Sequence, residues 1–98
     1  ATKFATEIPY KVMETAKNSI EIMLEMMENG IQNSLSDGGV GILCAKTAVT
    51  GAYFNVKINA KDIKDRKFAN EILVKAEMIY QKTCALEVKM MNIINEKL

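Results

Sequence analysis

The sequence predicts an all-α protein in which three long helices form a bundle. Three observations support this prediction. Apolar residues recur with a period near 3.6 in three long segments, the connections between these segments are short, and the 98 residues include one proline. A chain of this length forms a single domain, and no internal repeat or low-complexity tract divides it.

The first helix is predicted over residues 7–29. Thr6 is the expected N-cap, Pro9 falls in the first turn, and Gly30 suits the position after the last turn. The apolar positions of this segment follow the period of an amphipathic helix and are Val12, Ala16, Ile20, Met23, Leu24 and Met27.

The second helix is predicted over residues 35–59, after a capping-box spacing between Ser34 and Asp37. It is apolar around most of its circumference, which is typical of a buried central helix. One stripe of small and polar residues covers roughly an 80° arc of this helix at 100° per residue. Its members are Asp37, Gly41, Ala45, Ala48, Ala52, Asn55 and Asn59.

The third helix is predicted over residues 65–97, with Asp65 as its N-cap and an apolar seam close to that of a coiled coil. A helix of that length measures roughly 45 Å, whereas a compact domain of this size has a radius of gyration near ~13 Å. We therefore expect the third helix to overhang its own domain. More protein would then cover it, either a missing segment or a symmetry partner.

Composition and charge exclude several classes of function. The formal net charge is +1 and histidine is absent, so we expect neither a nucleic-acid-binding protein nor imidazole chemistry. Two lysines and the asparagines of the second helix argue against a membrane span. Cys44 and Cys84 have no CxxC spacing, which predicts a reducing, cytoplasmic location and no metal site.

The polar stripe of the second helix has two interpretations. Buried amides and carboxylates each cost on the order of 1 to 3 kcal/mol if they lack a partner, so these groups must be bonded. They either bond to the backbone of neighbouring helices or line a cleft for a ligand. A basic cluster follows the stripe and is either a solvated turn or a site for an anionic group; it contains Lys57, Lys61, Lys64, Arg66 and Lys67.

Two blocks of this helix carry a resemblance to a known family. NSLSD (33–37) with the following Gly39-Val40, and Gly51-Ala52 leading into NVKIN (55–59), occur at matching separation. The chain resembles the cyclodeaminase/cyclohydrolase family, which includes the C-terminal domain of formiminotransferase-cyclodeaminase and stand-alone relatives acting on methenyltetrahydrofolate. Members are about twice as long and begin with a glycine-rich half that has no match here. The resemblance therefore identifies residues 1–98 as a C-terminal half.

The resemblance implies an all-helical fold, a homodimer and a folate substrate, with no cofactor beyond the tetrahydrofolate derivative itself. Asp37 is then the candidate catalytic carboxylate, because a carboxylate stabilises the amidinium cation of the one-carbon unit and can move a proton. The candidate substrate-binding residues are Ser34, Ser36, Asn55, Asn59, Lys57 and Lys61.

Three functions remain open at this point. The first is formiminotetrahydrofolate cyclodeaminase, which is favoured by the breadth of the family alone. The second is methenyltetrahydrofolate cyclohydrolase. The third, from a different class, is a non-catalytic helical module in which the asparagines specify helix register and the third helix dimerises.

Overall fold

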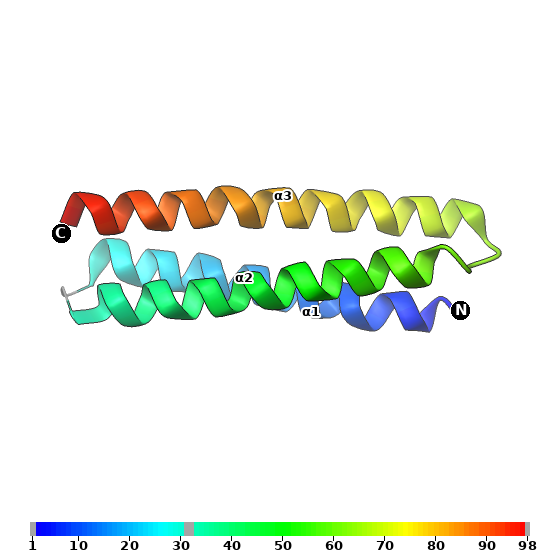
Figure 1. Cartoon of the computed structure of the whole chain (residues 1–98), viewed down its shortest axis with the longest axis horizontal. Helices are drawn as coiled ribbons and strands as arrows, with labels where there is room; N and C mark the ends of the chain where they lie inside the picture. Colours follow the sequence, from blue (N-terminus) through cyan, green and yellow to red (C-terminus); the bar gives the residue numbers. More distant parts are fainter. Residues whose placement is uncertain (1, 31–32, 98) are drawn as a thin grey trace.

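The computed structural model describes residues 2–30 and 33–97, which form three helices, each antiparallel to the one before it in the chain (Figure 1). Helix α1 spans Phe4–Asn29, α2 spans Asn33–Ala60 and α3 spans Arg66–Lys97. The N-terminus and the α2–α3 connection lie at one end of the bundle, and the C-terminus lies at the other end with the α1–α2 connection (Figure 1). The predicted all-α fold of three long helices is therefore confirmed.

The start of α1 differs from the prediction. The helix begins at Phe4, three residues earlier than expected, and Thr6 is a buried helical residue, not the N-cap. The Thr6 hydroxyl donates a 2.7 Å hydrogen bond to the carbonyl of Lys3, so the side chain bonds inside the first turn. Gly30 ends α1 in an extended conformation with φ −93°, and not in the left-handed one that the prediction implied.

The predicted cap of α3 is confirmed. Asp65 Oδ1 accepts a 3.1 Å hydrogen bond from the backbone N–H of Phe68, which satisfies one of the free donors at the start of the helix. The same carboxylate forms a 2.9 Å ion pair with Lys3 near the start of α1. The hydrogen bond from Phe68 is the main cause that lowers the pKa of Asp65, and Lys3 adds to it.

The expectation that the third helix overhangs its domain is wrong. The molecule measures 50 × 16 × 16 Å, with a radius of gyration of 15.4 Å. Helices α1 and α2, with 26 and 28 residues, are nearly as long as the 32-residue α3. The bundle is elongated because all three helices lie alongside one another, so the ends of α3 have neighbours.

The core runs along the axis of the bundle in three clusters of buried side chains. The central cluster is Met13, Val49, Ala52, Tyr53, Val56, Ile72 and Ala76. The cluster beside the α1–α2 connection is Ile20, Leu24, Met27, Leu35, Ile42, Met90 and Ile93. The smallest cluster closes the end at the α2–α3 connection and is Ala60, Ile63 and Ala69.

Two glycines let α1 approach α2 closely. A Cβ added at Gly38 would lie 2.6 Å from Cγ of the buried Met27, and one added at Gly41 would lie 2.7 Å from Sδ of Met23. Both distances are shorter than any ordinary carbon contact. The glycine-rich start of α2 is therefore a packing surface for the methionines of α1.

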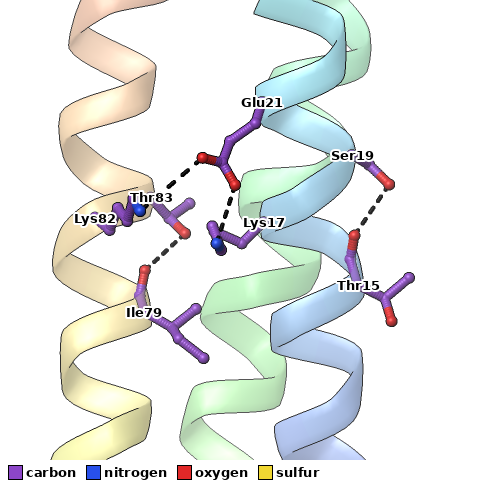
Figure 2. Close-up of polar contacts among 7 residues, drawn as sticks. All are labelled: Thr15, Lys17, Ser19, Glu21, Ile79, Lys82 and Thr83. Atoms are coloured by element: carbon purple, nitrogen blue, oxygen red, sulfur yellow. Dashed lines mark hydrogen bonds and ion pairs between the residues drawn. The ribbon is translucent and has the colours of Figure 1, made fainter.

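Ion pairs tie α3 to both other helices, and we call these contacts the α3 flank. The carboxylate of Glu21 on α1 pairs with Nζ of Lys17 at 3.0 Å and with Nζ of Lys82 on α3 at 4.0 Å (Figure 2). Farther along, Lys89 of α3 pairs with Glu28 at 3.1 Å. Lys46 of α2 pairs with Glu87 of α3 at 3.0 Å.

The outer side of α1 and α2, unlike the α3 flank, exposes apolar side chains. The prediction that α2 is buried around most of its circumference is wrong, because one side of it faces outward. We call this surface the open face and define it by its exposed apolar side chains, which are Ile8, Val12, Met26, Val40, Leu43, Phe54 and Ile58. In the described parts of the chain, no helix is both long and apolar enough to cross a membrane.

Candidate functional site

Asp37 lies at the mouth of a cavity between the end of α1 and the start of α2. The cavity has a volume of about 320 Å³ and is lined by Asp37, Gly38 and the three methionines Met23, Met26 and Met27. The Asp37 carboxylate is exposed, while Met27 is fully buried behind it. A mostly apolar cavity with one polar group at its edge is typical of small-molecule sites, and thioethers pack well against aromatic rings.

A second groove of about 430 Å³ lies between the first half of α1 and the second half of α2. Asn55 and Asn59 supply its side-chain amides, and the remaining lining residues are Ala5, Ile8, Pro9, Val12, Ala48 and Ala52. The small residues Ala48 and Ala52 belong to the predicted stripe and keep the floor of the groove open. This part of the stripe therefore does line a groove.

One of the two amides has a structural partner. Asn59 Nδ2 donates a 2.9 Å hydrogen bond to the carbonyl oxygen of Ala5. In a regular helix that carbonyl would accept from the N–H four residues later, but position 9 is proline and has no N–H. Asn59 thus supplies the hydrogen bond that Pro9 cannot make. Of the two interpretations of the polar stripe, hydrogen bonding to the backbone of a neighbouring helix is therefore confirmed for Asn59.

The predicted site residues do not form one cluster in a single chain. Asp37 and Asn55 are 18 positions apart on α2, which is roughly 27 Å along the helix axis. Lys57 lies about 200° around the helix from Asn55 and faces α3. The structure therefore separates the carboxylate, the amides and the lysine into different surroundings.

Lys57 belongs to a polar network on the α3 flank. Its Nζ lies 5.1 Å from the ring centroid of Tyr53, a favourable cation–π arrangement. The Tyr53 hydroxyl donates a hydrogen bond to Glu77 Oε2, and its ring stacks on Tyr80 at 4.9 Å between centroids. The hydrogen bond to Glu77 and burial raise the pKa of Tyr53 to about 12. The same bond, together with one from Gln81, lowers the pKa of Glu77.

The remaining predicted residues lie near the two ends of α2. Ser36 is exposed beside Asp37, and the side chain of Ser34 lies outside the described part of the structure. Lys61 is exposed in the turn after α2, where its main-chain carbonyl accepts a 3.4 Å hydrogen bond from Arg66. Arg66 also donates to the carbonyls of Ala60 and Ile63, so its guanidinium has a structural role in this turn.

Sequence reasoning missed the α1 side of both cavities. Met23 and Met27 were predicted only as apolar positions of the first helix, and Ile8 and Val12 were not assigned to a groove. The spacing of Ile8 and Val12, four residues apart beside the buried face of α1, was the available signal. Nothing in the sequence signalled the Tyr53–Glu77 bond, because the two residues are 24 positions apart on different helices.

Comparison with known proteins shows which family this chain is similar to. Residues 1–78 match the family described as formiminotransferase-cyclodeaminase. The chain is 32% identical over 97 residues to methenyltetrahydrofolate cyclohydrolase of Methylorubrum extorquens, covering 99% of this chain and 47% of that protein. It is 39% identical over 69 residues to formimidoyltransferase-cyclodeaminase of Gallus gallus, covering 70% of this chain and 13% of that protein.

The rat protein of the same name is also 39% identical, over 64 residues that cover 65% of this chain and 12% of the relative. This chain therefore belongs to the formiminotransferase-cyclodeaminase family, as the resemblance in its sequence predicted. The chain spans about half the length of the bacterial relative and a smaller share of the animal ones.

Proposed function

We propose that this protein acts on the one-carbon unit of a tetrahydrofolate derivative, as a formiminotetrahydrofolate cyclodeaminase. Membership of the family supports the substrate class. The observation that carries the proposal within the molecule is the position of Asp37. Its exposed carboxylate stands at the mouth of the methionine-lined cavity, where an aromatic ring system would pack against thioethers beside a negative charge.

The role of Asp37 follows from the reaction. In cyclodeamination, N10 of the folate attacks the formimino carbon, and the resulting tetrahedral carbon expels ammonia to leave the methenyl bridge. A proton must pass from N10 to the departing nitrogen. The carboxylate of Asp37 accepts and returns that proton, and it stabilises the cation before and after the tetrahedral stage. The folate carries the reactive carbon, and the protein provides orientation and charge.

The other site residues are assigned to binding. Ser34 and Ser36 flank the Asp37 cavity in the sequence, and their hydroxyls can both donate and accept hydrogen bonds. Asn55 and Asn59 are assigned to a ligand in the second groove, and Lys61 to an anionic group near it. These residues lie roughly 27 Å or more along α2 from Asp37, and Lys57 faces α3, so within one chain none of them contacts the carbon that reacts at Asp37. Asn59 also retains its hydrogen bond to Ala5, so its Oδ1 is the atom available to a ligand.

Methenyltetrahydrofolate cyclohydrolase is the second candidate. One observation favours it, since the relative that aligns with 99% of this chain has that name. In this reaction water adds to the methenyl carbon and the bridge opens. Asp37 would remove a proton from the attacking water, so the same carboxylate serves either reaction.

The test compares wild type with Asp37→Asn in two assays. Binding of 5-formyltetrahydrofolate, a stable analogue of the formimino compound, is measured by calorimetry. Turnover is measured by ammonia release from the formimino substrate and by opening of the methenyl compound. We expect Asp37→Asn to reduce turnover by about 10² to 10⁴-fold, with analogue binding changed only a few-fold, because the carboxylate acts on the transition state.

Glu25→Gln is the matched control, since Glu25 is an exposed carboxylate of α1 that does not line the cavity. It should retain wild-type turnover. Ammonia release without methenyl opening assigns the cyclodeaminase, and the reverse assigns the cyclohydrolase. If the wild-type chain fails to bind the analogue, the folate proposal is wrong and the non-catalytic helical module becomes the better explanation.

A further inference from the structure

The end of α1 does not satisfy its own carbonyl groups. The last four carbonyl oxygens of a helix have no intrahelical N–H to accept from. Gly30 follows α1 in an extended conformation, with φ −93° and ψ 177°, so it does not form the left-handed cap that would bond them. The last five residues of α1 include Glu25 and Glu28 and no basic residue, and carboxylates are unfavourable at the negative end of a helix dipole. The end of α1 therefore needs donors and positive charge from another element.

Lys97 of α3 supplies both the donors and the positive charge. Its Nζ donates one 3.0 Å hydrogen bond to the carbonyl of Met27 and another of 3.0 Å to the carbonyl of Glu28. Both carbonyls belong to the four that α1 leaves without an intrahelical partner. An ammonium group is favourable at a helix C-terminus, and hydrogen bonds from a charged donor are stronger than neutral ones. We call these two bonds the Lys97 clamp.

Apolar packing brings Lys97 to the end of α1. The last turn of α3 lies at the same end of the bundle as the α1–α2 connection (Figure 1). Ile93, one turn before Lys97 on the same side of α3, is buried with Met27 and Leu35 in one core cluster. Burial of Ile93 therefore places the ammonium of Lys97 within reach of carbonyls that are 69 and 70 positions away in the sequence.

The Lys97 clamp holds one wall of the Asp37 cavity. Met26 and Met27 line that cavity from α1, and Gly38 lines it from α2. A Cβ added at Gly38 would lie 2.6 Å from Cγ of Met27, so Met27 already fills the space beside the residue that follows Asp37. Even a small displacement of Met27 would therefore change the shape of the cavity next to the carboxylate. The hydrogen bond to the Met27 carbonyl limits that displacement.

The neighbouring ion pair of the α3 flank differs from the clamp. Lys89 pairs with Glu28 at 3.1 Å, but its partner there is a side-chain carboxylate, and the two side chains are 58% and 43% exposed. An exposed ion pair of this kind contributes little to stability and leaves the backbone free. Both lysines line the same hollow of about 480 Å³ at the end of the bundle. Lys89 is therefore a matched control for Lys97.

We propose that Lys97 is a positioning residue for the Asp37 site, because it holds the carbonyls of Met27 and Glu28 and so keeps the methionine wall of the cavity in place for the substrate. Lys97 does not line the cavity and acts through the backbone of α1. This inference rests on the proposed function for the substrate, although the clamp itself does not require folate. Loss of the clamp should weaken substrate binding more than the chemical step, since the Asp37 carboxylate keeps its place on α2.

The first experiment tests the clamp without folate. Hydrogen–deuterium exchange of residues 23–29 is compared in wild type, Lys97→Met, Lys97→Arg and Lys89→Met, after circular dichroism has shown that all four are equally helical. Lys97→Met keeps the apolar stem and removes the ammonium, so exchange should be about 3- to 10-fold faster. Lys97→Arg retains a charged donor and should stay within about twofold of wild type, as should Lys89→Met. Exchange as slow in Lys97→Met as in wild type, or equally fast in Lys97→Met and either other variant, would overturn the clamp.

The second experiment tests the positioning role. Binding of 5-formyltetrahydrofolate is measured by calorimetry, and kcat and KM are measured in the two turnover assays. Lys97→Met should weaken analogue binding and raise KM by about 3- to 10-fold, with kcat changed by less than about twofold. Lys97→Arg should restore both values, and Lys89→Met should leave them unchanged. This pattern is the opposite of the one expected for Asp37→Asn, which reduces turnover and preserves binding.

The two experiments separate the possible failures. Faster exchange in Lys97→Met with unchanged binding and KM would overturn the positioning role and leave Lys97 as a cap of α1. A fall in kcat with unchanged KM would overturn it as well. A wild-type chain that binds no analogue would instead refute the proposed function, while the exchange rates would still decide whether the clamp holds the end of α1.

Discussion

The two long sides of this bundle are held together in different ways. On the α3 flank, ion pairs and the Tyr53–Glu77 hydrogen bond join α3 to α1 and α2. Between α1 and α2, Asn59 donates a hydrogen bond to the carbonyl of Ala5, and Met23 and Met27 pack against the glycines of α2. The outward surface of α2 carries few charges, whereas on α3 lysines and glutamates alternate with the exposed apolar side chains Val74, Met78, Val88 and Met91.

The two sides of the molecule differ in how much apolar surface, uninterrupted by charge, they expose to water. On α3, charged side chains at the edges remain favourable in water, although Val74, Met78, Val88 and Met91 are exposed there as well. The open face leaves Phe54 and Ile58 in water, and apolar surface of this kind gains about 25 cal/mol per Å² when it is covered. The cavity of Asp37 and the groove of the asparagines both open on this side, since Met26 lines the first and Ile8 and Val12 line the second.

The largest expected loss of stability comes from a comparison of two isoleucines on opposite sides of α2. Ile42 is fully buried and Ile58 is 61% exposed. Ile42→Ala should lower the free energy of unfolding by about 2 to 5 kcal/mol, because it leaves a cavity in the core. Ile58→Ala should change it by less than about 1 kcal/mol. Urea denaturation at a protein concentration low enough to keep the chain monomeric measures both, and equal losses would contradict the assignment of the open face.

The next effect concerns the polar tie between α1 and α2. Asn59→Ala should cost about 1 to 2 kcal/mol, because the carbonyl of Ala5 loses its donor. In a Pro9→Ala background the backbone N–H of residue 9 replaces that donor, so the same change should cost about 1 kcal/mol less. A double-mutant cycle by thermal unfolding measures this coupling. Strictly additive effects would show that Asn59 does not compensate for Pro9.

A smaller effect compares two glycines of α2. Gly51 lies on the open face with free space around it, so Gly51→Ala should stabilise the monomer by about 0.5 to 1 kcal/mol through helix propensity. Gly38→Ala gains the same propensity but collides with Met27, so it should be at least about 1 kcal/mol less stable than Gly51→Ala. Differential scanning calorimetry measures the pair, and identical melting temperatures would mean that α1 and α2 are not in close contact at Gly38.

The smallest effect belongs to the α3 flank. The hydrogen bond from Lys17 is the main cause that lowers the pKa of Glu21 below its ordinary value of 4.5, and Lys82 adds to it. Since the folded-state pKa is lowered, this stabilisation is present above pH 4.5 and is lost as the pH falls through the folded-state pKa. Glu21→Gln should therefore cost at most about 0.5 kcal/mol at pH 7. Unfolding curves of wild type and variant should converge near pH 2, and a difference that persists there would exclude the ion pair as its cause.

Much of the fold was predictable because helices are local structures. The 3.6-residue period located all three helices, and Asp65 was correctly predicted to cap α3. The start of α1 was wrong, because Thr6 satisfies a typical N-cap pattern while its hydroxyl bonds to the carbonyl of Lys3 inside the helix. The same side chain can serve either position, and only the path of the preceding backbone decides between them.

The candidate site was less predictable. The family and its blocks around Asp37 and Asn55 were recognisable, since they are contiguous in the sequence. The 18 positions between Asp37 and Asn55 already correspond to roughly 27 Å along one helix, but a helical wheel projects all positions onto one circle and leaves that separation out. The wheel does place Lys57 beside Tyr53, four residues away, but it cannot show that this side of α2 packs against α3, where Tyr53 bonds to Glu77.

By itself, the sequence determined the three helices, the family and the stripe of small and polar residues on α2, because each depends on residues close together in the chain. The tertiary structure decided which side of α2 is covered, since burial depends on how α1 and α3 pack against it. It also paired Asn59 with the carbonyl that Pro9 leaves free, and Tyr53 with Glu77, because those contacts join residues 54 and 24 positions apart. Side chains so distant in sequence meet only when the packing of whole helices has brought their backbones together.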